Sequence, residues 1–206
     1  MPPQRLVIAT HNRKKAGEMT TILGAALPGI ELLTLSDFEG APEPDETGET
    51  YIANARIKAE SAAGFTGEWS LADDAGLEID ALDGAPGLYS KRFGGEELPF
   101  PEKMAKILSM LEGMPEGARD ARFRCAVALA RPGQPTEEFE ATCEGRIAET
   151  PSGSGGFGYD PIFYLPELGR TMAELTPADK HTVSHRGKVL RKVIERLRAQ
   201  ACPPLS

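Results

Sequence analysis

Two adjacent aspartates, Asp73 and Asp74, follow the apolar end of the segment "WSLA". Neighbouring carboxylates beside apolar residues are costly unless a cation or hydrogen bonds compensate their charge. One of them can hold Mg²⁺ while the other orients or deprotonates a water molecule, which is the chemistry of a metal-assisted hydrolase. A plain Asp-Asp turn is the alternative. We expect two strands, "WSLADD" and "GLEIDAL", separated by a turn at residues 73–76.

Carboxylates are also concentrated in the segment "PEPDETGET" (residues 42–50), which has four of them, including Asp45 and Glu46, and no basic residue. Their mutual repulsion becomes useful if a hard cation such as Mg²⁺ sits among them, and a mobile acidic loop is the alternative. Residues 180–198 have the opposite bias, with seven Lys or Arg and one Glu. Together these segments suit a small anionic substrate that carries a divalent cation, although two solvated faces would have the same composition.

Polar and basic residues, "THNRKK" (residues 10–15), follow the apolar run "RLVIA". This pattern predicts a strand that passes into a helix, where free backbone N–H groups and the helix dipole attract phosphate. The motif serves the same purpose as a P-loop but lacks its sequence pattern. A capped helix with a solvated lysine-rich first turn is the alternative.

The segment "SGSGGFGYDP" (residues 152–161) has four glycines within six positions, together with Phe157, Tyr159 and Asp160. Glycines allow the backbone to approach a flat ring closely, an aromatic face can stack on that ring, and the aspartate can accept its N–H groups. A structural turn that ends in proline is the alternative. The segment "KHTVSHRGK" (residues 180–188) adds donors for an anion or a carbonyl oxygen. Its Ser-His pair does not indicate a hydrolase triad, because the two residues are sequence neighbours.

The elements that position these residues follow from apolar spacing. Helices are expected from about residue 13 to Leu27, after Thr50 as N-cap, at about 101–114, and at about 185–200 after Ser184. Residues 120–149 predict a β-hairpin that turns at 132–135. We therefore expect an α/β fold, with a central twisted mixed β-sheet flanked by helices. Residues 1–206 would form a single two-lobed domain, ordered from about 5 to 198, with the active site in the cleft between the lobes.

Composition excludes several classes of function. The formal net charge of −8 argues against binding to nucleic acid, which needs a positive surface. The longest apolar run is far too short to cross a membrane, and the first residues show no secretory signal. Cys125, Cys143 and Cys202 lack metal-ligand spacing, which is typical of a reducing compartment. A cytoplasmic protein with no membrane or nucleic-acid partner is the expectation.

Five motifs together resemble one family, the noncanonical purine nucleoside triphosphate pyrophosphatases of the bacterial inosine/xanthosine triphosphate type. The motifs, in the order and at roughly the spacing of that family, are "THNRKK", "DETGETYIANARIKA", "ADDAGLEIDALDGAPGLYSKRFGG", "GGFGYDPIF" and "KHTVSHRGK". The resemblance covers essentially residues 5–198. It implies a two-lobed α/β fold, usually in a homodimer. It also implies Mg-dependent hydrolysis of ITP, dITP and XTP to the nucleoside monophosphate and pyrophosphate.

The resemblance also implies roles for single residues. Asp74 would accept a proton from water and would bind Mg²⁺ together with Asp45 or Glu46. The triphosphate would be held by Lys58 and by the loop residues Thr10, His11, Asn12, Arg13, Lys14 and Lys15. The purine base would be bound by Phe157, Gly158, Tyr159, Asp160, Lys180, His185 and Arg186. Ala75 lies where the family has a small residue in contact with substrate.

Two features depart from the family pattern. His11, Arg13 and Lys14 crowd a loop that often contains glycine. Ala75 replaces a common hydroxyl residue, which removes one potential hydrogen bond to substrate. Two other functions remain open on the sequence. A nucleotide-binding regulator would need the base pocket but no water-activating carboxylate, and a general nucleotide phosphatase would release orthophosphate.

Overall fold

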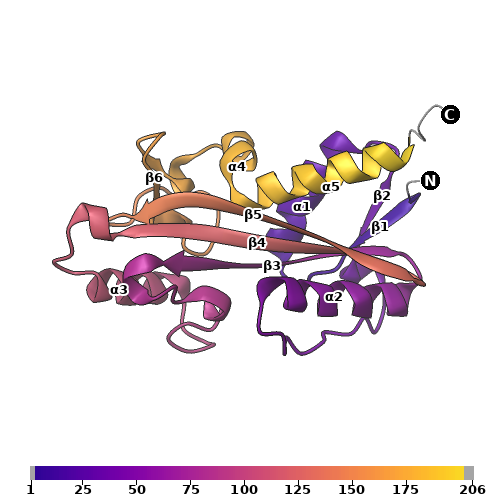
Figure 1. Cartoon of the computed structure of the whole chain (residues 1–206), viewed down its shortest axis with the longest axis horizontal. Coiled ribbons are helices and arrows are strands. Elements are labelled where there is room, and N and C mark those ends of the chain that lie inside the picture. Colours follow the sequence, from indigo (N-terminus) through magenta and orange to yellow (C-terminus); the bar gives the residue numbers. More distant parts are fainter. Residues whose placement is uncertain (1–2, 202–206) are drawn as a thin grey trace. The chain divides into compact units, whose positions relative to one another are not determined.

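The computed structural model describes residues 3–201, so Cys202 lies outside the described residues. Seven strands form one sheet in the order β2-β1-β3-β4-β5-β6-β7. Strand β1 pairs in parallel with β2 and β3, whereas β6 pairs antiparallel with β5 and β7. The sheet is therefore mixed, and helices accompany it (Figure 1), which confirms the predicted α/β fold class.

The chain divides into two compact units. Unit 1 comprises Met1–Asp74, Cys125–Ala141 and Arg186–Ser206, and unit 2 comprises Ala75–Arg124 and Thr142–His185. The strands β3 (Trp69–Ile79), β4 (Asp120–Arg131) and β5 (Gln134–Ile147) contribute residues to both. A single two-lobed domain with a cleft between its lobes stays a prediction.

Unit 1 contains the strands β1 (Arg5–Ile8) and β2 (Glu31–Thr34) and the helices α1 (Arg13–Ala26), α2 (Tyr51–Thr66) and α5 (His185–Ala201), apart from His185 itself. In Figure 1, α1 and α5 lie on one side of the strands and α2 lies on the other. The buried face of α2 consists largely of alanines, which pack on Val7, Ala72 and Ala128. Small side chains bring this helix close to the sheet, and with it the polar residues that α2 carries.

Unit 2 contains α3 (Phe100–Met110), α4 (Pro177–Val183), β6 (Phe163–Leu165) and β7 (Arg170–Thr171). Its core joins Leu77 and Ile79 of β3 to Ile107 of α3 and to Phe163. Tyr159, from the glycine-rich segment, belongs to the same core and is 3% exposed. That segment is therefore anchored to the interior by one of its aromatic side chains.

Most of the predicted elements are present. The four expected helices occur as α1, α2, α3 and α5, although α3 ends at Met110. The hairpin turns at residues 132–133, where Gly133 has a φ of +70°. The strands β2, β6 and β7 and the helix α4 were not predicted. These elements are short, and short segments carry too few apolar positions to show a period.

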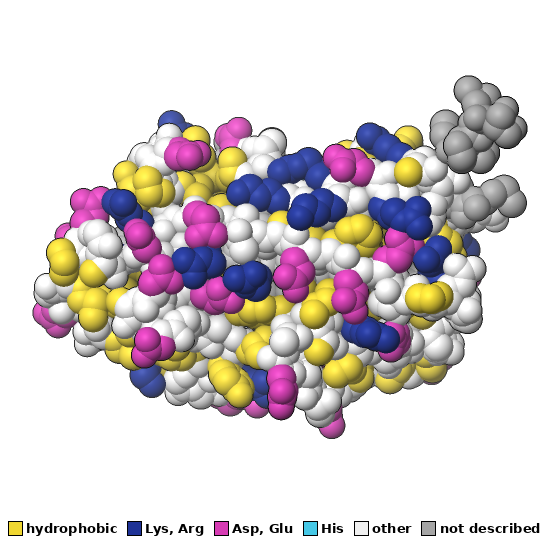
Figure 2. All heavy atoms as spheres, in the orientation of Figure 1, with side chains coloured by type: hydrophobic (Ala, Val, Ile, Leu, Met, Phe, Trp, Pro, Cys, Tyr) yellow, Lys and Arg dark blue, Asp and Glu magenta, His cyan; other side chains and the backbone are white. Residues whose placement is uncertain are grey.

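Charges of both signs share the surface. On the face drawn in Figure 2, Lys and Arg side chains are interspersed with Asp and Glu side chains. Within the basic segment, Lys180 and Arg186 are buried, whereas Arg191, Lys192 and Arg198 are exposed. The segment is thus not simply a solvated face. None of the helices in the described part of the chain is both long and apolar enough to cross a membrane.

Candidate active site

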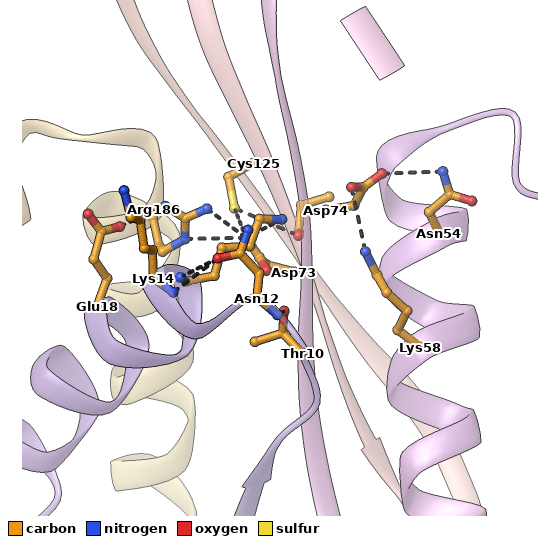
Figure 3. A network of polar contacts seen from close by, with 12 residues as sticks. Thr10, Asn12, Lys14, Glu18, Asn54, Lys58, Asp73, Asp74, Cys125 and Arg186 are labelled. Atoms are coloured by element: carbon orange, nitrogen blue, oxygen red, sulfur yellow. Dashed lines mark hydrogen bonds and ion pairs between the residues drawn. The ribbon is translucent and has the colours of Figure 1, made fainter. Parts of the chain in front are cut away.

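Asp73 and Asp74 lie inside one continuous strand, β3, and not in the turn that we expected. Successive side chains of a strand point to opposite faces, and Figure 3 shows the two carboxylates on opposite sides of β3. Asp73 meets residues of α1 and α5, whereas Asp74 meets residues of α2. Each carboxylate is compensated by polar or basic partners inside the protein, so the two aspartates can be buried in a strand and need no solvent-exposed turn. The two therefore differ in environment.

Asp73 is the centre of a buried cluster of charges. Its Oδ2 atom accepts hydrogen bonds from Nε and Nη2 of Arg186, at 3.2 and 2.9 Å, and lies 3.3 Å from Nζ of Lys15. Glu18 binds Nη1 of the same arginine at 2.8 Å. Burial alone would raise the pKa of Asp73, but the charges of Lys15, Arg186 and Lys58 outweigh it and lower that pKa. Asp73 is thus a permanent anion that fixes two cations.

Asp74 has a different set of partners. Its Oδ2 atom accepts a hydrogen bond from Nδ2 of Asn54 at 3.2 Å, and its Oδ1 atom lies 3.5 Å from Nζ of Lys58. Burial raises the pKa of Asp74, and the nearby Glu46 and Asp73 raise it further, against the opposing charges of Lys58 and Lys15. A carboxylate whose pKa moves toward neutrality is suited to accept a proton.

Lys58 connects Asp74 to the acidic segment. Its Nζ atom lies 2.7 Å from Oε1 of Glu46 and 3.5 Å from Oδ1 of Asp74, so two carboxylates from distant segments share one positive charge. Burial lowers the pKa of Lys58, but Asp74, Asp73 and Glu46 outweigh that effect and raise it. Asp45 is exposed, and its carbonyl accepts the N–H of Thr47. Of the two candidates in this segment, Glu46 is the one that the structure brings to Asp74.

This arrangement fits a magnesium ion that completes its shell with substrate. No group of three or more His, Cys, Asp or Glu in the described part of the chain could hold a metal by itself. Mg²⁺ is usually bound through one or two carboxylates together with waters and substrate phosphates. Glu46 and Asp74 supply hard oxygen donors that already converge on one cationic group. Their number and chemistry match that mode of binding.

The motif "THNRKK" forms the capped start of α1. Oδ1 of Asn12 accepts the N–H groups of Lys14 and Lys15 at 3.0 and 3.1 Å, and Oγ1 of Thr10 accepts the N–H of Asn12 at 3.2 Å. His11 contacts the carbonyl of Pro42 through Nε2 at 3.4 Å, which ties the loop to the acidic segment. The remaining residue, Arg13, is the first of the helix and is exposed. The expected capping is thus present, and it places Lys15 beside Asp73.

In unit 2, the glycine-rich segment folds around Asp160. The Oδ2 atom of Asp160 accepts the N–H of Phe157 at 2.8 Å and the Nζ donor of Lys180 at 2.7 Å. That ammonium also lies 4.8 Å from the centre of the Phe157 ring. Gly156 has a φ of +68°, and a Cβ atom there would lie 2.0 Å from Oδ2 of Asp160. Only glycine at this position leaves room for the ion pair.

Other predicted base-binding residues have structural partners of their own. The hydroxyl of Tyr159 donates to the carbonyl of Ser90 at 2.8 Å, and the Phe100 ring meets the Tyr159 ring edge-on at 5.2 Å. Gly158 has a φ of +69°. His185 is buried and stacks on Phe123, with ring centres 4.7 Å apart.

The remaining candidates lie in different surroundings. Ala75 is partly buried in β3 and is the first residue of unit 2. Arg186 belongs to unit 1, where its three donor nitrogens bind Asp73 and Glu18. The structure therefore groups Arg186 with Lys15, and it groups Lys180 with Phe157 and Asp160.

Two polar residues of the site were not predicted from the sequence. Asn54 is 3% exposed and contacts Asp74, and Glu18 contacts Arg186. The sequence did hold a signal for Asn54, because it is an amide beside the alanine face of α2, one turn before Lys58. Glu18 follows Lys15 by three positions on α1, but nothing in the sequence indicated a partner in α5.

Residues 6–196 match the model of the Ham1 family. Two similar curated proteins are the dITP/XTP pyrophosphatases of Geobacillus kaustophilus and Desulforamulus reducens. The first is 50% identical over 192 residues, which is 93% of this chain and 93% of the relative. The second is 48% identical over 191 residues, which is 93% of this chain and 94% of the relative.

Solved structures of Ham1 proteins are also similar to this chain. A HAM1 protein from Coxiella burnetii is similar with a TM-score of 0.84 and 40% identity, over 94% of this chain and 98% of that one. The Staphylococcus aureus Ham1 protein is similar with a TM-score of 0.85 and 35% identity, over 95% and 99%. Fold and sequence therefore agree over nearly the full length of each chain.

Proposed function

The chain belongs to the Ham1 family, and on that premise we propose that it hydrolyses deaminated purine nucleoside triphosphates. The substrates would be dITP, ITP and XTP, and the products the nucleoside monophosphate and pyrophosphate. The two relatives that match along 93% or more of their own length are dITP/XTP pyrophosphatases, which supports this proposal. In a cell, the reaction would remove deaminated purines from the nucleotide pool.

The observation that carries the chemistry is the environment of Asp74. Hydrolysis needs a group that takes a proton from water as the water attacks phosphorus. Asp74 is buried, it has a raised pKa, and Asn54 holds one of its oxygens while the other faces Lys58. In the proposed role, Asp74 accepts the proton of a water that attacks the α-phosphorus in line with the leaving pyrophosphate.

Unit 1 would bind the triphosphate. Lys15 and Lys58 supply ammonium groups for phosphate oxygens, and the start of α1 supplies backbone N–H groups and the positive end of the helix dipole. Thr10 and Asn12 shape this loop through the hydrogen bonds described above. His11, Arg13 and Lys14 add charge and donors at its rim.

Glu46 and Asp74 would hold Mg²⁺ together with phosphate oxygens of the substrate. When bound, the ion would neutralise negative charge on the phosphates, including the charge that develops on the leaving group. Glu46 is favoured over Asp45 because its carboxylate shares the Lys58 ammonium with Asp74.

Unit 2 would bind the base. Phe157 offers an aromatic face, and Lys180 is a donor for the 6-keto oxygen that hypoxanthine and xanthine carry. Adenine has an amino group there, so a donor in the site would face a donor and the polar groups would be left unpaired. Gly158, Tyr159 and Asp160 would shape the backbone around the ring. The other residues proposed to contact the base or the adjacent part of the substrate are His185 and Ala75 of unit 2 and Arg186 of unit 1.

The test is the identity of the products. Purified full-length chain is incubated with Mg²⁺ and, in separate reactions, dITP, ITP, XTP and dATP, and both pyrophosphate and orthophosphate are quantified. We expect pyrophosphate from the first three substrates and far less from dATP. Orthophosphate release would indicate a general phosphatase, and release of neither product would indicate a nucleotide-binding regulator.

We also propose a cytoplasmic homodimer, in line with the family resemblance. Light scattering coupled to size-exclusion chromatography measures the mass of the particle directly. A mass near twice 22.1 kDa supports the dimer, and a mass near 22.1 kDa contradicts it.

A further inference from the structure

Asn54 links the acidic segment to the carboxylate of Asp74, and we infer that it is a positioning residue for the reaction. The role rests on the proposed function, because it concerns the residues that would activate water and hold Mg²⁺. Asn54 would touch neither water nor substrate. It would act through the groups on either side of its amide.

The amide of Asn54 makes two hydrogen bonds in opposite directions. Its Oδ1 atom accepts the backbone N–H of Gly48 at 2.8 Å, and its Nδ2 atom donates to Oδ2 of Asp74 at 3.2 Å. A backbone N–H can only donate, and an ionised carboxylate can only accept. The amide therefore fits in a single orientation. Figure 3 shows Asn54 and Lys58 approaching Asp74 from α2.

The hydrogen bond between Gly48 and Asn54 leaves no room for a side chain at position 48. A Cβ atom at position 48 would lie 2.7 Å from Oδ1 of Asn54 and 2.7 Å from Cβ of Ala53. Real Cβ atoms do not approach other atoms this closely, so a side chain here would force the acidic segment away from α2. Glu46 lies two residues before Gly48, and its position follows that of the segment.

One buried side chain, Asn54, therefore fixes the position of the segment that carries Glu46 relative to the carboxylate of Asp74. Asn54 is 3% exposed, so water does not readily replace it. By holding Oδ2 of Asp74, it leaves Oδ1 facing Lys58, whose Nζ atom also binds Glu46. Removing a residue that hydrogen-bonds to a metal ligand and so orients it typically lowers metal affinity or activity by about 10- to 100-fold.

The experiment compares Asn54→Leu with Gly48→Ala and with the control Thr50→Ala, all in the full-length chain. Leucine keeps the branched shape of Asn54, with methyl groups in place of the amide oxygen and nitrogen, and makes neither hydrogen bond. The Thr50 hydroxyl caps the same helix by accepting the N–H of Ala53 at 3.2 Å, so its loss weakens α2 but leaves the link intact. Three quantities are measured for each protein: thermal unfolding, Mn²⁺ binding by electron paramagnetic resonance without nucleotide, and kcat and KM for dITP.

We expect Asn54→Leu to lower kcat and Mn²⁺ affinity by about 10- to 100-fold, with a much smaller change in KM. Gly48→Ala should change the same quantities in the same direction, and it covers the case in which Asn54→Leu does not fold. Thr50→Ala should lower the unfolding temperature but change kcat and Mn²⁺ affinity less than threefold. If the Asn54 and Gly48 variants change only the unfolding temperature, like Thr50→Ala, the positioning role is wrong. If wild type binds Mn²⁺ but releases no pyrophosphate, the proposed function is wrong, and the Mn²⁺ measurements still decide the role of Asn54.

Discussion

Asp73→Asn and Asp74→Asn are expected to change the stability of the protein in opposite directions. The two residues are neighbours in β3, both are buried, and each substitution replaces a carboxylate by an amide of the same shape. Their environments differ, because Asp73 binds two cations, Arg186 and Lys15, whereas Asp74 is buried with one cation, Lys58, and is repelled by the charge of Glu46. Each variant is therefore the matched control of the other.

Asp73→Asn should lower the free energy of unfolding at pH 7 by about 3 to 5 kcal/mol, the usual effect of removing one partner of a buried ion pair. Arg186 is 2% exposed and would lose the anion bound to its Nε and Nη2. The pKa of Asp73 is lowered in the folded chain. Its stabilising contribution is thus present above the unfolded pKa of about 3.9 and is lost as the pH falls toward the folded pKa. The difference from wild type should shrink below about pH 4.

Asp74→Asn should raise the free energy of unfolding at pH 7, by less than Asp73→Asn lowers it. The pKa of Asp74 is raised in the folded chain, chiefly by burial. A raised pKa stabilises the fold below the unfolded pKa, and that stabilisation is lost as the pH rises through the folded pKa. At neutral pH the ionised carboxylate is a net cost, which the amide removes, although part of the gain is offset by lost attraction to Lys58.

Urea unfolding followed by the fluorescence of Trp69, the only tryptophan, measures both effects at pH 7 and at pH 3. Equal losses of stability at pH 7 in the two variants would refute the assignment of opposite environments. A stabilising Asp73→Asn would refute it as well.

Three further predictions concern single groups. Lys15→Ala should raise KM for dITP, at a cost of about 1.5 to 3 kcal/mol in binding, because a charged hydrogen bond to phosphate is lost; unchanged steady-state kinetics would assign Lys15 to the Asp73 cluster alone. Gly156→Ala should lower kcat/KM for dITP by up to about 100-fold, since the new Cβ displaces the pair formed by Asp160 and Lys180; normal kcat/KM in a folded variant would show that this pair does not act on substrate. Burial raises the pKa of the Cys125 thiol to about 12, so iodoacetamide at pH 8 should leave Cys125 unmodified in the folded chain, which peptide mass mapping checks against chain unfolded in urea.

The sequence was most informative where one element carries its own pattern. The alanine face of α2 and the apolar face of α5 repeat often enough to predict both helices, and the turn after Arg131 is marked by proline and glycine. Asp73 and Asp74 stood out because two adjacent charges interrupt an apolar run. Their place within a continuous strand could not be predicted, since it depends on cations that are distant in sequence.

Long-range partners also explain the other differences at the site. Arg186 is 113 residues from Asp73 and 168 from Glu18, and no local pattern connects them. We expected Asp160 to accept hydrogen bonds from a ligand, but its Oδ2 atom binds Phe157 and Lys180 of its own chain. The residue types in the motifs indicated which chemistry to expect. Which of these residues contact one another depends on the fold and could not be predicted from the sequence.

Hydrolysis of dITP in water labelled with oxygen-18 tests the central proposal most directly. Products are separated and the label is located by mass spectrometry, with Asp74→Asn as the companion reaction. If water attacks the α-phosphorus, the label appears in dIMP and the pyrophosphate is unlabelled, and Asp74→Asn slows the reaction by at least about 100-fold. Label in pyrophosphate or in orthophosphate would contradict the proposed attack at the α-phosphorus, and an Asp74→Asn variant with more than about half of wild-type turnover would contradict the role of Asp74 as the base.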